Sequence, residues 1–406
     1  MPTPRYGLCS AVVDGKIYAI GGGQRRMMMI TPLDVVERYD PRTDTWDTDV
    51  APMNSSRYNA AAAAVNGKIY VIGGRGEHGE ILDSVEEYDP QTDAWAERSP
   101  MPTLREGLAL AVLHGNIYAL GGSGQMGMPL ATVERYDPAT DRWDTDVPSM
   151  VTPRISLAAA VLDSAIYAIG GFFYGPVVSV ERYQPGIGWS EVEDMIAPRG
   201  YCGAAAVKDS IFAIGGSNQN GQLNSVEAYS PFGDGGWDTI EPMNFAREGL
   251  TSSTVDDKIY AIGGIARMHH QMLEILDIVE EYTAAVTSVV EIPPVMPRDF
   301  LLYQNYPNPF NPSTTIRYAI PSAEHRAKSR GKGVDSKLSA LRTTLRIYNL
   351  LGQEVKILVD EPKEAGYYSV SWDGKDSTGR DVASGVYFVQ LRSGPLSLTR
   401  KAILLR

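Results

Sequence analysis

Residues 66–74 read NGKIYVIGG, and residues 84–90 read SVEEYDP, with a tryptophan following at position 95. Close variants of these letters occur six times, with the first glycine of each pair at positions 21, 73, 121, 170, 215 and 263. A self-similar period of 45 to 52 residues is typical of a four-stranded unit repeated around an axis. The repeat therefore predicts an all-β chain whose larger part is a six-bladed β-propeller.

The second repeat illustrates how one blade is built. A small apolar run at 60–65, a turn and a second run at 68–72 predict the first two strands. The diglycine that ends the second strand allows positive φ and a close approach of backbones. After a variable loop, residues 84–88 and the segment opened by Trp95 predict the third and fourth strands.

The repeat resembles the kelch motif in its diglycine, in a tyrosine and a tryptophan at fixed offsets, and in an arginine that opens each unit. The resemblance covers about residues 4–295 and implies a propeller that binds ligands through the loops of one face. We interpret the repeated Arg, Glu, Tyr and Trp as scaffold, because a single site does not need six copies of one residue. The opening arginines are Arg5, Arg57, Arg105, Arg154, Arg199 and Arg247.

The sixth repeat departs from this pattern. It lacks the Asp-Pro turn and the tryptophan, so its fourth strand is expected at residues 287–292. Residues 1–5 resemble residues 101–105, a junction between two repeats, and they contain no apolar segment of a signal peptide. We therefore expect that the start is truncated, which leaves ring closure open.

Function is expected where the repeats differ. In an antiparallel blade, the loop after the second strand and the link to the next blade lie on the same face, and both are variable here. Aromatic rings with Arg, Asn and Glu suit a glycan or protein ligand, because rings stack on apolar surfaces while polar groups fix orientation. The alternative is an ordinary solvated rim. The predicted ligand-binding face consists of Tyr6, Arg25, Arg26, Tyr58, Asn59, Arg75, His78, Glu106, Phe172, Tyr174, Tyr201, Asn218, Glu248, Arg267 and His269.

Catalysis is the alternative to binding, and neither a cofactor nor a metal is predicted. The galactose-oxidase kind of kelch propeller holds copper with two His and two Tyr, whereas three of the five histidines here fall on the variable face and suggest no such set. A sialic-acid mutarotase-like activity, also found on six kelch blades, needs a Glu and an Arg, for which Glu106, Glu248 and Arg267 are candidates. The sequence favours a binding module over an enzyme, with a structural envelope role as a third interpretation.

The periodicity changes near residue 295. The predicted boundaries are 1–295 for the propeller, 296–303 for a Pro-rich linker and 304–406 for an immunoglobulin-like sandwich, in which runs of alternating residues predict six strands. A basic stretch at residues 322–341 predicts a flexible insertion.

The second domain carries distinctive motifs: NYPNPFNPSTTI at residues 305–316, WDGKD at 372–376 and ASGVYF at 383–388. They closely resemble the C-terminal sorting domain of type IX secretion, which is related to the flagellar hook-scaffold immunoglobulin-like fold. The resemblance implies a bacterial cargo that type IX machinery moves from the periplasm to the outer cell surface or the medium. The alternative is an accessory sandwich without a sorting role. The sorting motif corresponds to Asn305, Tyr306, Pro307, Asn308, Pro309 and Phe310.

Charge divides the chain at the same place. Residues 1–295 carry 20 Lys and Arg against 39 Asp and Glu, whereas residues 296–406 carry 17 against 10. An acidic propeller argues against nucleic acid as a partner, because affinity for nucleic acid comes mainly from neutralising phosphates.

The sequence contains no apolar run of about 18 residues, so it predicts no membrane span. Cys9 and Cys202 are expected to be buried and unpaired.

Overall fold

The computed structural model describes residues 1–26, 29–231, 236–267, 273–283, 300–303, 305, 310–321 and 341–405. These residues belong to two compact units, one ending at Thr283 and the other beginning at Phe300. Every regular element among them is a β-strand, which confirms the predicted all-β class. The predicted boundary near residue 295 lies outside the described residues and stays a prediction.

Each repeat of the first unit forms an antiparallel sheet whose strands follow the chain outward from the axis. The first three sheets contain β1 (Cys9–Val13), β2 (Lys16–Ile20), β5 (Val36–Asp40) and β6 (Thr45–Asp47); β7 (Ala61–Val65), β8 (Lys68–Ile72), β9 (Val85–Asp89) and β10 (Ala94–Arg98); and β11 (Ala109–Leu113), β12 (Asn116–Leu120), β13 (Val133–Asp137) and β14 (Arg142–Asp144). The next three contain β15 (Ala158–Leu162), β16 (Ala165–Ile169), β17 (Val180–Gln184) and β18 (Gly188–Glu191); β19 (Gly203–Val207), β20 (Ser210–Ile214), β23 (Val226–Tyr229) and β24 (Trp237–Ile240); and β25 (Thr251–Val255), β26 (Lys258–Ile262) and β29 (Val279–Thr283). The fourth strand expected at residues 287–292 lies outside the described residues.

Three short hairpins extend the loops that follow the diglycines of repeats one, five and six. They are β3 (Gly23–Arg26) with β4 (Met29–Pro32), β21 (Ser217–Asn218) with β22 (Gly221–Gln222), and β27 (Ile265–Arg267) with β28 (Leu273–Ile275). Because these loops differ between repeats, the hairpins make one face of the ring uneven.

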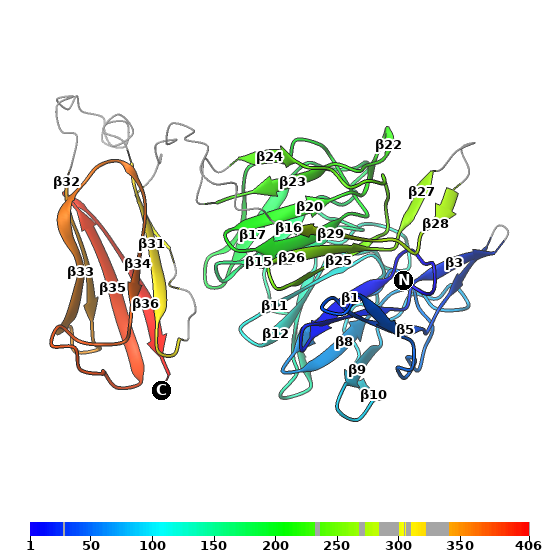
Figure 1. Ribbon diagram of the computed structural model, residues 1–406, viewed down its shortest axis with the longest axis horizontal. Helices are drawn as coiled ribbons and strands as arrows, with labels where there is room; N and C mark the ends of the chain where they lie inside the picture. The colour runs from blue at the N-terminus through cyan, green and yellow to red at the C-terminus, as the bar shows by residue number, and fades with distance from the viewer. Residues whose placement is uncertain are drawn as a thin grey trace. The chain divides into compact units, whose positions relative to one another are not determined.

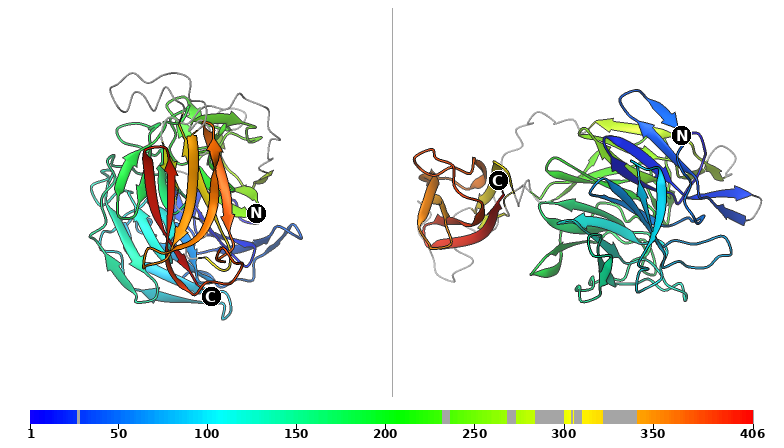
Figure 2. Two further views of the ribbon diagram at one scale, coloured as in Figure 1. Left: turned by 90° about the vertical axis from the view of Figure 1, so that its left-hand side faces the viewer. Right: turned by 90° about the horizontal axis from the view of Figure 1, so that it is seen from below.

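The innermost strands contact one another around an axis. Strands β1, β7, β11, β15, β19 and β25 touch in that order, and β25 lies beside β1 (Figures 1 and 2). Strand β7 is AAAAV, with alternate residues buried. Small side chains of this kind let neighbouring inner strands approach closely, so the alanine-rich runs suit the crowded centre of the ring.

Aromatic residues at repeated positions join each blade to the next. The ring of Tyr88 packs on that of Trp95 in the same blade with centroids 5.0 Å apart, and this pair has equivalents in four other blades. Across the blade boundary, Tyr18 lies 5.8 Å from Tyr88, and Trp95 Nε1 donates to the carbonyl of Ala51 at 2.8 Å. These contacts confirm that the repeated Tyr and Trp are scaffold.

Each opening arginine holds two blades together. The Arg105 guanidinium is fully buried, donates to the carbonyl of Gly121 at 3.0 Å and pairs with Glu134 in its own blade. Its backbone carbonyl accepts from the amide of Gly74 in the preceding blade at 3.0 Å. The same arrangement recurs at the other five arginines, which confirms the predicted polar pair.

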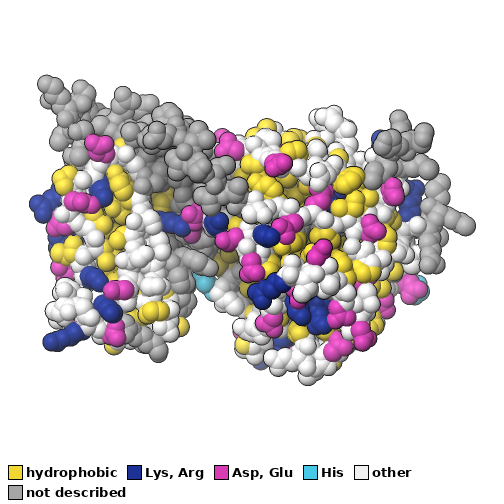
Figure 3. Space-filling view, in the orientation of Figure 1, with side chains coloured by type: hydrophobic (Ala, Val, Ile, Leu, Met, Phe, Trp, Pro, Cys, Tyr) yellow, Lys and Arg dark blue, Asp and Glu magenta, His cyan; other side chains and the backbone are white. Residues whose placement is uncertain are grey.

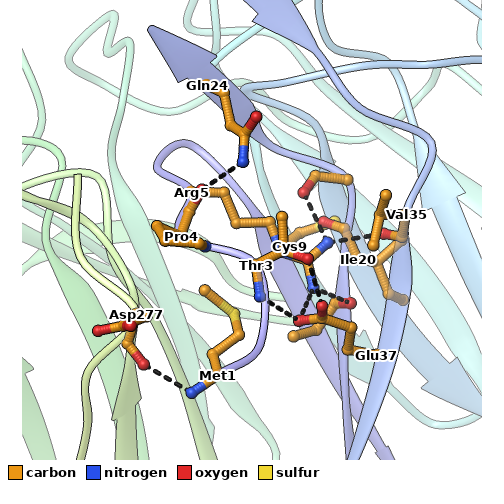
Figure 4. A network of polar contacts seen from close by, with 12 residues as sticks. Met1, Thr3, Pro4, Arg5, Cys9, Ile20, Gln24, Val35, Glu37 and Asp277 are labelled. Atoms are coloured by element: carbon orange, nitrogen blue, oxygen red, sulfur yellow. Dashed lines mark hydrogen bonds and ion pairs between the residues drawn. The ribbon is translucent and has the colours of Figure 1, made fainter. Parts of the chain in front are cut away.

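The ring closes through the same contacts at the N-terminus (Figure 4). Arg5 donates to the Glu37 carboxylate at 2.9 Å within the first blade, and its carbonyl accepts from the Gly264 amide of the sixth blade at 3.0 Å. The Met1 amino group donates to the carbonyl of Asp277 at 2.6 Å. The described residues of the first and sixth blades are therefore joined directly.

The second unit is a two-sheet sandwich. One sheet contains β30 (Leu301–Leu302), β31 (Thr314–Ile320) and β34 (Gly366–Trp372), and the other β33 (Glu354–Lys363), β32 (Leu341–Tyr348), β35 (Gly385–Ser393) and β36 (Leu396–Leu404). Its core contains Trp372 and Tyr318 from the first sheet and Leu345 and Val389 from the second. All six strands predicted from residue 314 onward are present. The bounds differ most for β32, which begins at 341 rather than 344, and for β33, which ends at 363 rather than 359.

The predicted sorting motif lies partly in this core. Phe310 is 2% exposed and packs on Trp372 with ring centroids 5.3 Å apart. Asn305 is also buried and donates to the hydroxyl of Thr314 at 3.0 Å. Residues 306–309 and the basic insertion, except Leu341, lie outside the described residues. Phe310 and Asn305 are therefore parts of the folded sandwich.

Candidate functional site

A ring of backbone hydrogen bonds surrounds the axis on the face that carries the variable loops. The second residue after each opening arginine has φ between 51° and 62°. Its amide donates to the carbonyl of the equivalent residue in another blade at 2.7–2.9 Å, and the six bonds form a closed cycle. Left-handed backbone suits glycine or asparagine best, and Tyr201 adopts it as well. The six residues are Gly7, Asn59, Gly107, Ser156, Tyr201 and Gly249.

A second layer of variable residues lies next to this ring. In each blade the residue after the opening arginine forms an antiparallel bridge with the residue after the diglycine. The scaffold therefore holds twelve positions in fixed places while leaving their side chains free to differ. The bridged pairs are Tyr6 and Gly23, Tyr58 and Arg75, Glu106 and Ser123, Ile155 and Phe172, Gly200 and Ser217, and Glu248 and Ile265.

Seven of these twelve positions line a hollow of about 570 Å³ in the first unit. Its lining mixes phenol rings, two arginines, two carboxylates and aliphatic side chains. Concave sites that combine apolar walls with a few polar groups are the usual places for ligand binding. We call this feature the axial hollow, and it is lined by Tyr6, Arg25, Ile30, Tyr58, Asn59, Arg75, Glu106, Ile155, Tyr201, Glu248, Gly249, Ile265 and Leu273.

Arg75 and Glu106 form a two-point ion pair on one side of the axial hollow. Arg75 Nε donates to Glu106 Oε2 at 3.0 Å, and its Nη2 donates to Oε1. Arg75 Nη1 donates to the carbonyl of Gly79 at 2.9 Å. The bond to Glu106 raises the pKa of Arg75. All three nitrogens of this guanidinium are therefore engaged within the protein.

Glu248 lies in a different environment. Gln222 Nε2 donates to Glu248 Oε1 at 3.0 Å, and within the described ranges no lysine or arginine forms an ion pair with this carboxylate. Burial, reinforced by Tyr58, Tyr201 and Glu248 and opposed by the charge of Arg25, raises the pKa of Tyr6 to about 12. Tyr6 therefore stays a neutral phenol at physiological pH, with two other phenols and a carboxylate nearby.

The side of the axial hollow near blades four and five is more apolar. The rings of Phe172 and Tyr201 pack with centroids 5.4 Å apart, and Ile155 lines the hollow beside them. A Cβ atom at Gly200 would collide with the ring of Phe172. The missing side chain at position 200 therefore makes room for this aromatic pair.

Eight of the fifteen predicted face residues line the axial hollow: Tyr6, Arg25, Tyr58, Asn59, Arg75, Glu106, Tyr201 and Glu248. Phe172 contacts it through Tyr201. Tyr174, His78, Asn218 and Arg267 lie on loops or hairpins outside its lining, and Tyr174 is 88% exposed. The Arg26 side chain and His269 lie outside what the structure describes.

Sequence reasoning missed the aliphatic part of the lining. Ile155 follows an opening arginine and Ile265 follows a diglycine, so the positional rule that selected Tyr58 and Arg75 also applies to them. Ile30 and Leu273 come from hairpins whose fold-back the sequence did not indicate. The signal for the first two was present, but only polar and aromatic residues were selected.

The described residues contain no group of three His, Cys, Asp or Glu side chains that is able to hold a metal ion. His114 lies in the turn between β11 and β12 with φ 52°, away from the axial hollow. In the described part of the chain, no helix has the length and apolar character needed to cross a membrane.

Comparisons with known families agree with this geometry. Residues 1–171 match the KLHDC2/KLHL20/DRC7 Kelch-repeats domain, and residues 198–231 match the Kelch motif. The first unit carries kelch repeats. Residues 326–394 match the FlgD Ig-like domain, so the second unit is immunoglobulin-like.

Individual relatives support the kelch assignment over short stretches. Human Kelch-like protein 23 is 38% identical over 73 residues, which is 18% of this chain and 11% of that protein. The mouse Influenza virus NS1A-binding protein homolog is 39% identical over 82 residues, covering 20% of this chain and 12% of the relative. This chain therefore aligns with only a small part of each relative's length.

A solved structure, "Structure of YjhT", superposes on 70% of this chain and 98% of its own, with a TM-score of 0.58 and 17% identity. At this level of identity the likeness concerns the fold alone. It supports a kelch-type propeller as the architecture of the first unit.

Proposed function

We propose that the kelch propeller is a ligand-binding module and that its ligand, a protein or a glycan, occupies the axial hollow. The proposal rests on the observation that the constant and the variable residues of the repeat have different roles. The repeated Arg, Glu, Tyr and Trp are committed to contacts within the ring, whereas seven of the twelve bridged positions that differ between blades line one hollow. Rigid scaffolds that display variable residues in a concavity are suited to recognition.

The lining supplies the two kinds of contact that recognition needs. Tyr58 and Tyr201 offer partly exposed rings, Ile155 offers an aliphatic contact, and Glu248 offers a polar one. Aromatic residues commonly contribute most to binding energy in such sites.

The experiment is a screen of the purified full chain on glycan and peptide arrays. The wild type should bind at least one ligand class, and the Tyr58→Ala/Tyr201→Ala double variant should lose at least about tenfold in affinity for it. His114→Ala, on a turn away from the axial hollow, is the matched control and should bind like the wild type. Equal binding by all three proteins contradicts the proposed site.

A sialic-acid mutarotase-like activity is a second candidate, favoured by the position of Glu248 in the axial hollow, where Arg25 also lies. Because Glu106 is paired with Arg75, Glu248 is the carboxylate better suited to proton transfer. Exchange between sialic-acid anomers, followed by NMR, should be accelerated by the wild type and not by Glu248→Gln. An unchanged uncatalysed rate with the wild type contradicts this candidate.

We also propose that the immunoglobulin-like unit directs export through type IX machinery, so that the propeller acts at the outer cell surface or in the medium. The resemblance of residues 305–316, 372–376 and 383–388 to the sorting domain supports this role. In a host with that machinery, a signal peptide should be fused to the full chain and to a chain ending at Met296. Retention of only the shortened chain in the periplasm is expected, and equal export contradicts the proposal.

A further inference from the structure

We infer that the axial hollow recognises a cationic side chain, a lysine or arginine of a protein partner, through the Glu248 carboxylate and the phenol rings of Tyr6 and Tyr201. This inference rests on the proposed function and specifies its ligand. The expected ligand is a basic protein segment rather than a neutral glycan.

The two carboxylates of the axial hollow differ in what they are able to bind. Glu106 is 8% exposed and already holds Arg75 through both of its oxygens. Glu248 is partly exposed, and the hydrogen bond that it receives comes from a neutral amide, that of Gln222. A carboxylate held by a neutral donor keeps its charge available for a ligand, and charge-assisted hydrogen bonds to it are strong.

The aromatic residues near Glu248 fit the same ligand. Tyr6 follows the opening arginine of blade one, and its ring lies close to Gly249, the neighbour of Glu248. Tyr201 is 38% exposed and also lines the axial hollow. The faces of neutral phenol rings attract ammonium and guanidinium groups. Rings combined with a carboxylate therefore favour a cation over an apolar or anionic group.

The lining offers fewer available hydrogen-bond donors to an anionic ligand. The guanidinium of Arg75 gives its donors to Glu106 and Gly79, so an anion would have to compete with a two-point ion pair. Arg25 lines the axial hollow as well, and its exposed side chain lies on the hairpin of β3 and β4.

The charge of the propeller points in the same direction. Residues 1–295 carry 39 acidic against 20 basic residues. On the face of the molecule shown in Figure 3, acidic and basic side chains are mixed. The net negative charge still attracts a basic partner over a longer range and speeds its approach.

The test measures binding of a fluorescein-labelled decapeptide of alternating Gly and Lys to the full chain by fluorescence anisotropy. The matched probe has acetyl-lysine at every Lys position, which removes the charge and keeps the side-chain length. The wild type should bind the lysine peptide at least about tenfold more tightly than the acetylated one. Glu248→Gln should remove most of this difference, and Tyr6→Leu should reduce the affinity about two- to fivefold.

The control is Glu191→Gln, which makes the same charge change on the outer strand β18 and should bind like the wild type. Equal loss in Glu191→Gln and Glu248→Gln would mean a general charge effect and overturn the inference. Equal affinity of the wild type for both peptides would overturn it as well. If neither peptide binds while an array ligand still requires Tyr58 and Tyr201, the inference fails and the proposed binding function stands.

Discussion

Arg75 of the second blade and Glu106 of the third form a two-point ion pair across the blade boundary, and both lie at positions that vary between repeats. The pair fixes the wall of the axial hollow without using a scaffold residue. Variable positions therefore serve two purposes in this propeller, since some shape the hollow and others remain available to a ligand.

Loss of either partner of this pair should destabilise the protein. We expect Arg75→Met and Glu106→Gln each to lower the free energy of unfolding, and a double-mutant cycle to give a coupling energy of about 1–2 kcal/mol, because Glu106 is largely buried. Chemical denaturation of the four proteins measures this coupling. Strictly additive effects would show that the pair does not contribute to stability.

The buried arginines should be far less tolerant. Arg105→Met leaves the Glu134 carboxylate buried without its partner, so a loss of about 3–5 kcal/mol in the free energy of unfolding is expected. The control is Arg135→Met, whose pair with Asp144 is solvent-exposed and should be worth less than about 1 kcal/mol. Similar losses for the two variants would contradict the scaffold role of the opening arginines.

Glu87 should make the stability of the folded protein fall as the pH becomes acidic. Burial alone would raise its pKa, but hydrogen bonds from Arg98, Lys68 and Tyr70 outweigh it and lower the pKa to about 2. A depressed folded pKa contributes stability above the unfolded value of 4.5, and this contribution is lost as the pH falls toward 2. The difference in unfolding free energy between the wild type and Glu87→Gln should therefore shrink from pH 5 downward. A constant difference across this range would refute the assignment.

Both cysteine thiols should be unreactive in the folded protein. Burial raises the pKa of Cys9 to about 12 and that of Cys202 to about 11, and neither forms a disulfide. Only a thiolate reacts readily with a thiol reagent. Titration with Ellman's reagent should release no colour from the native chain and two equivalents after denaturation. Rapid reaction of the native protein would show that these strands open easily.

Gly200 should be required for the aromatic side of the axial hollow. Gly200→Ala places a methyl group against the Phe172 ring, so we expect a loss of about 1–3 kcal/mol in unfolding free energy. Phe172→Leu in the same chain should restore much of it, because the smaller side chain leaves room for the methyl group. Gly175→Ala, where no atom lies near the added methyl group, is the control. The prediction fails if the two alanine variants have equal stability.

Much of the fold could be predicted from the sequence because the elements of a blade recur from one repeat to the next. The strands at 68–72 and 314–320 agree with their predicted bounds, and the opening arginines pair with the repeated glutamates as expected. Closure of the ring could not be predicted, because it depends on contacts between Arg5 and Gly264, which are far apart in the chain.

The candidate site was predicted less completely. Eight residues chosen by position line the axial hollow, but the engagement of Arg75 by Glu106 depends on the approach of two blades and has no local signal. Selection by polarity also left out Ile155 and Ile265. Position in the repeat therefore identifies lining residues, such as Ile155 and Ile265, that selection by polarity leaves out.

The decisive measurement is the structure of the protein in complex with the tightest ligand from the array screen. We expect this ligand to lie in the axial hollow and to contact Tyr58, Tyr201 and Glu248. A ligand bound instead at the turns of the opposite face, such as Asn66-Gly67, or along the outer strands would contradict it.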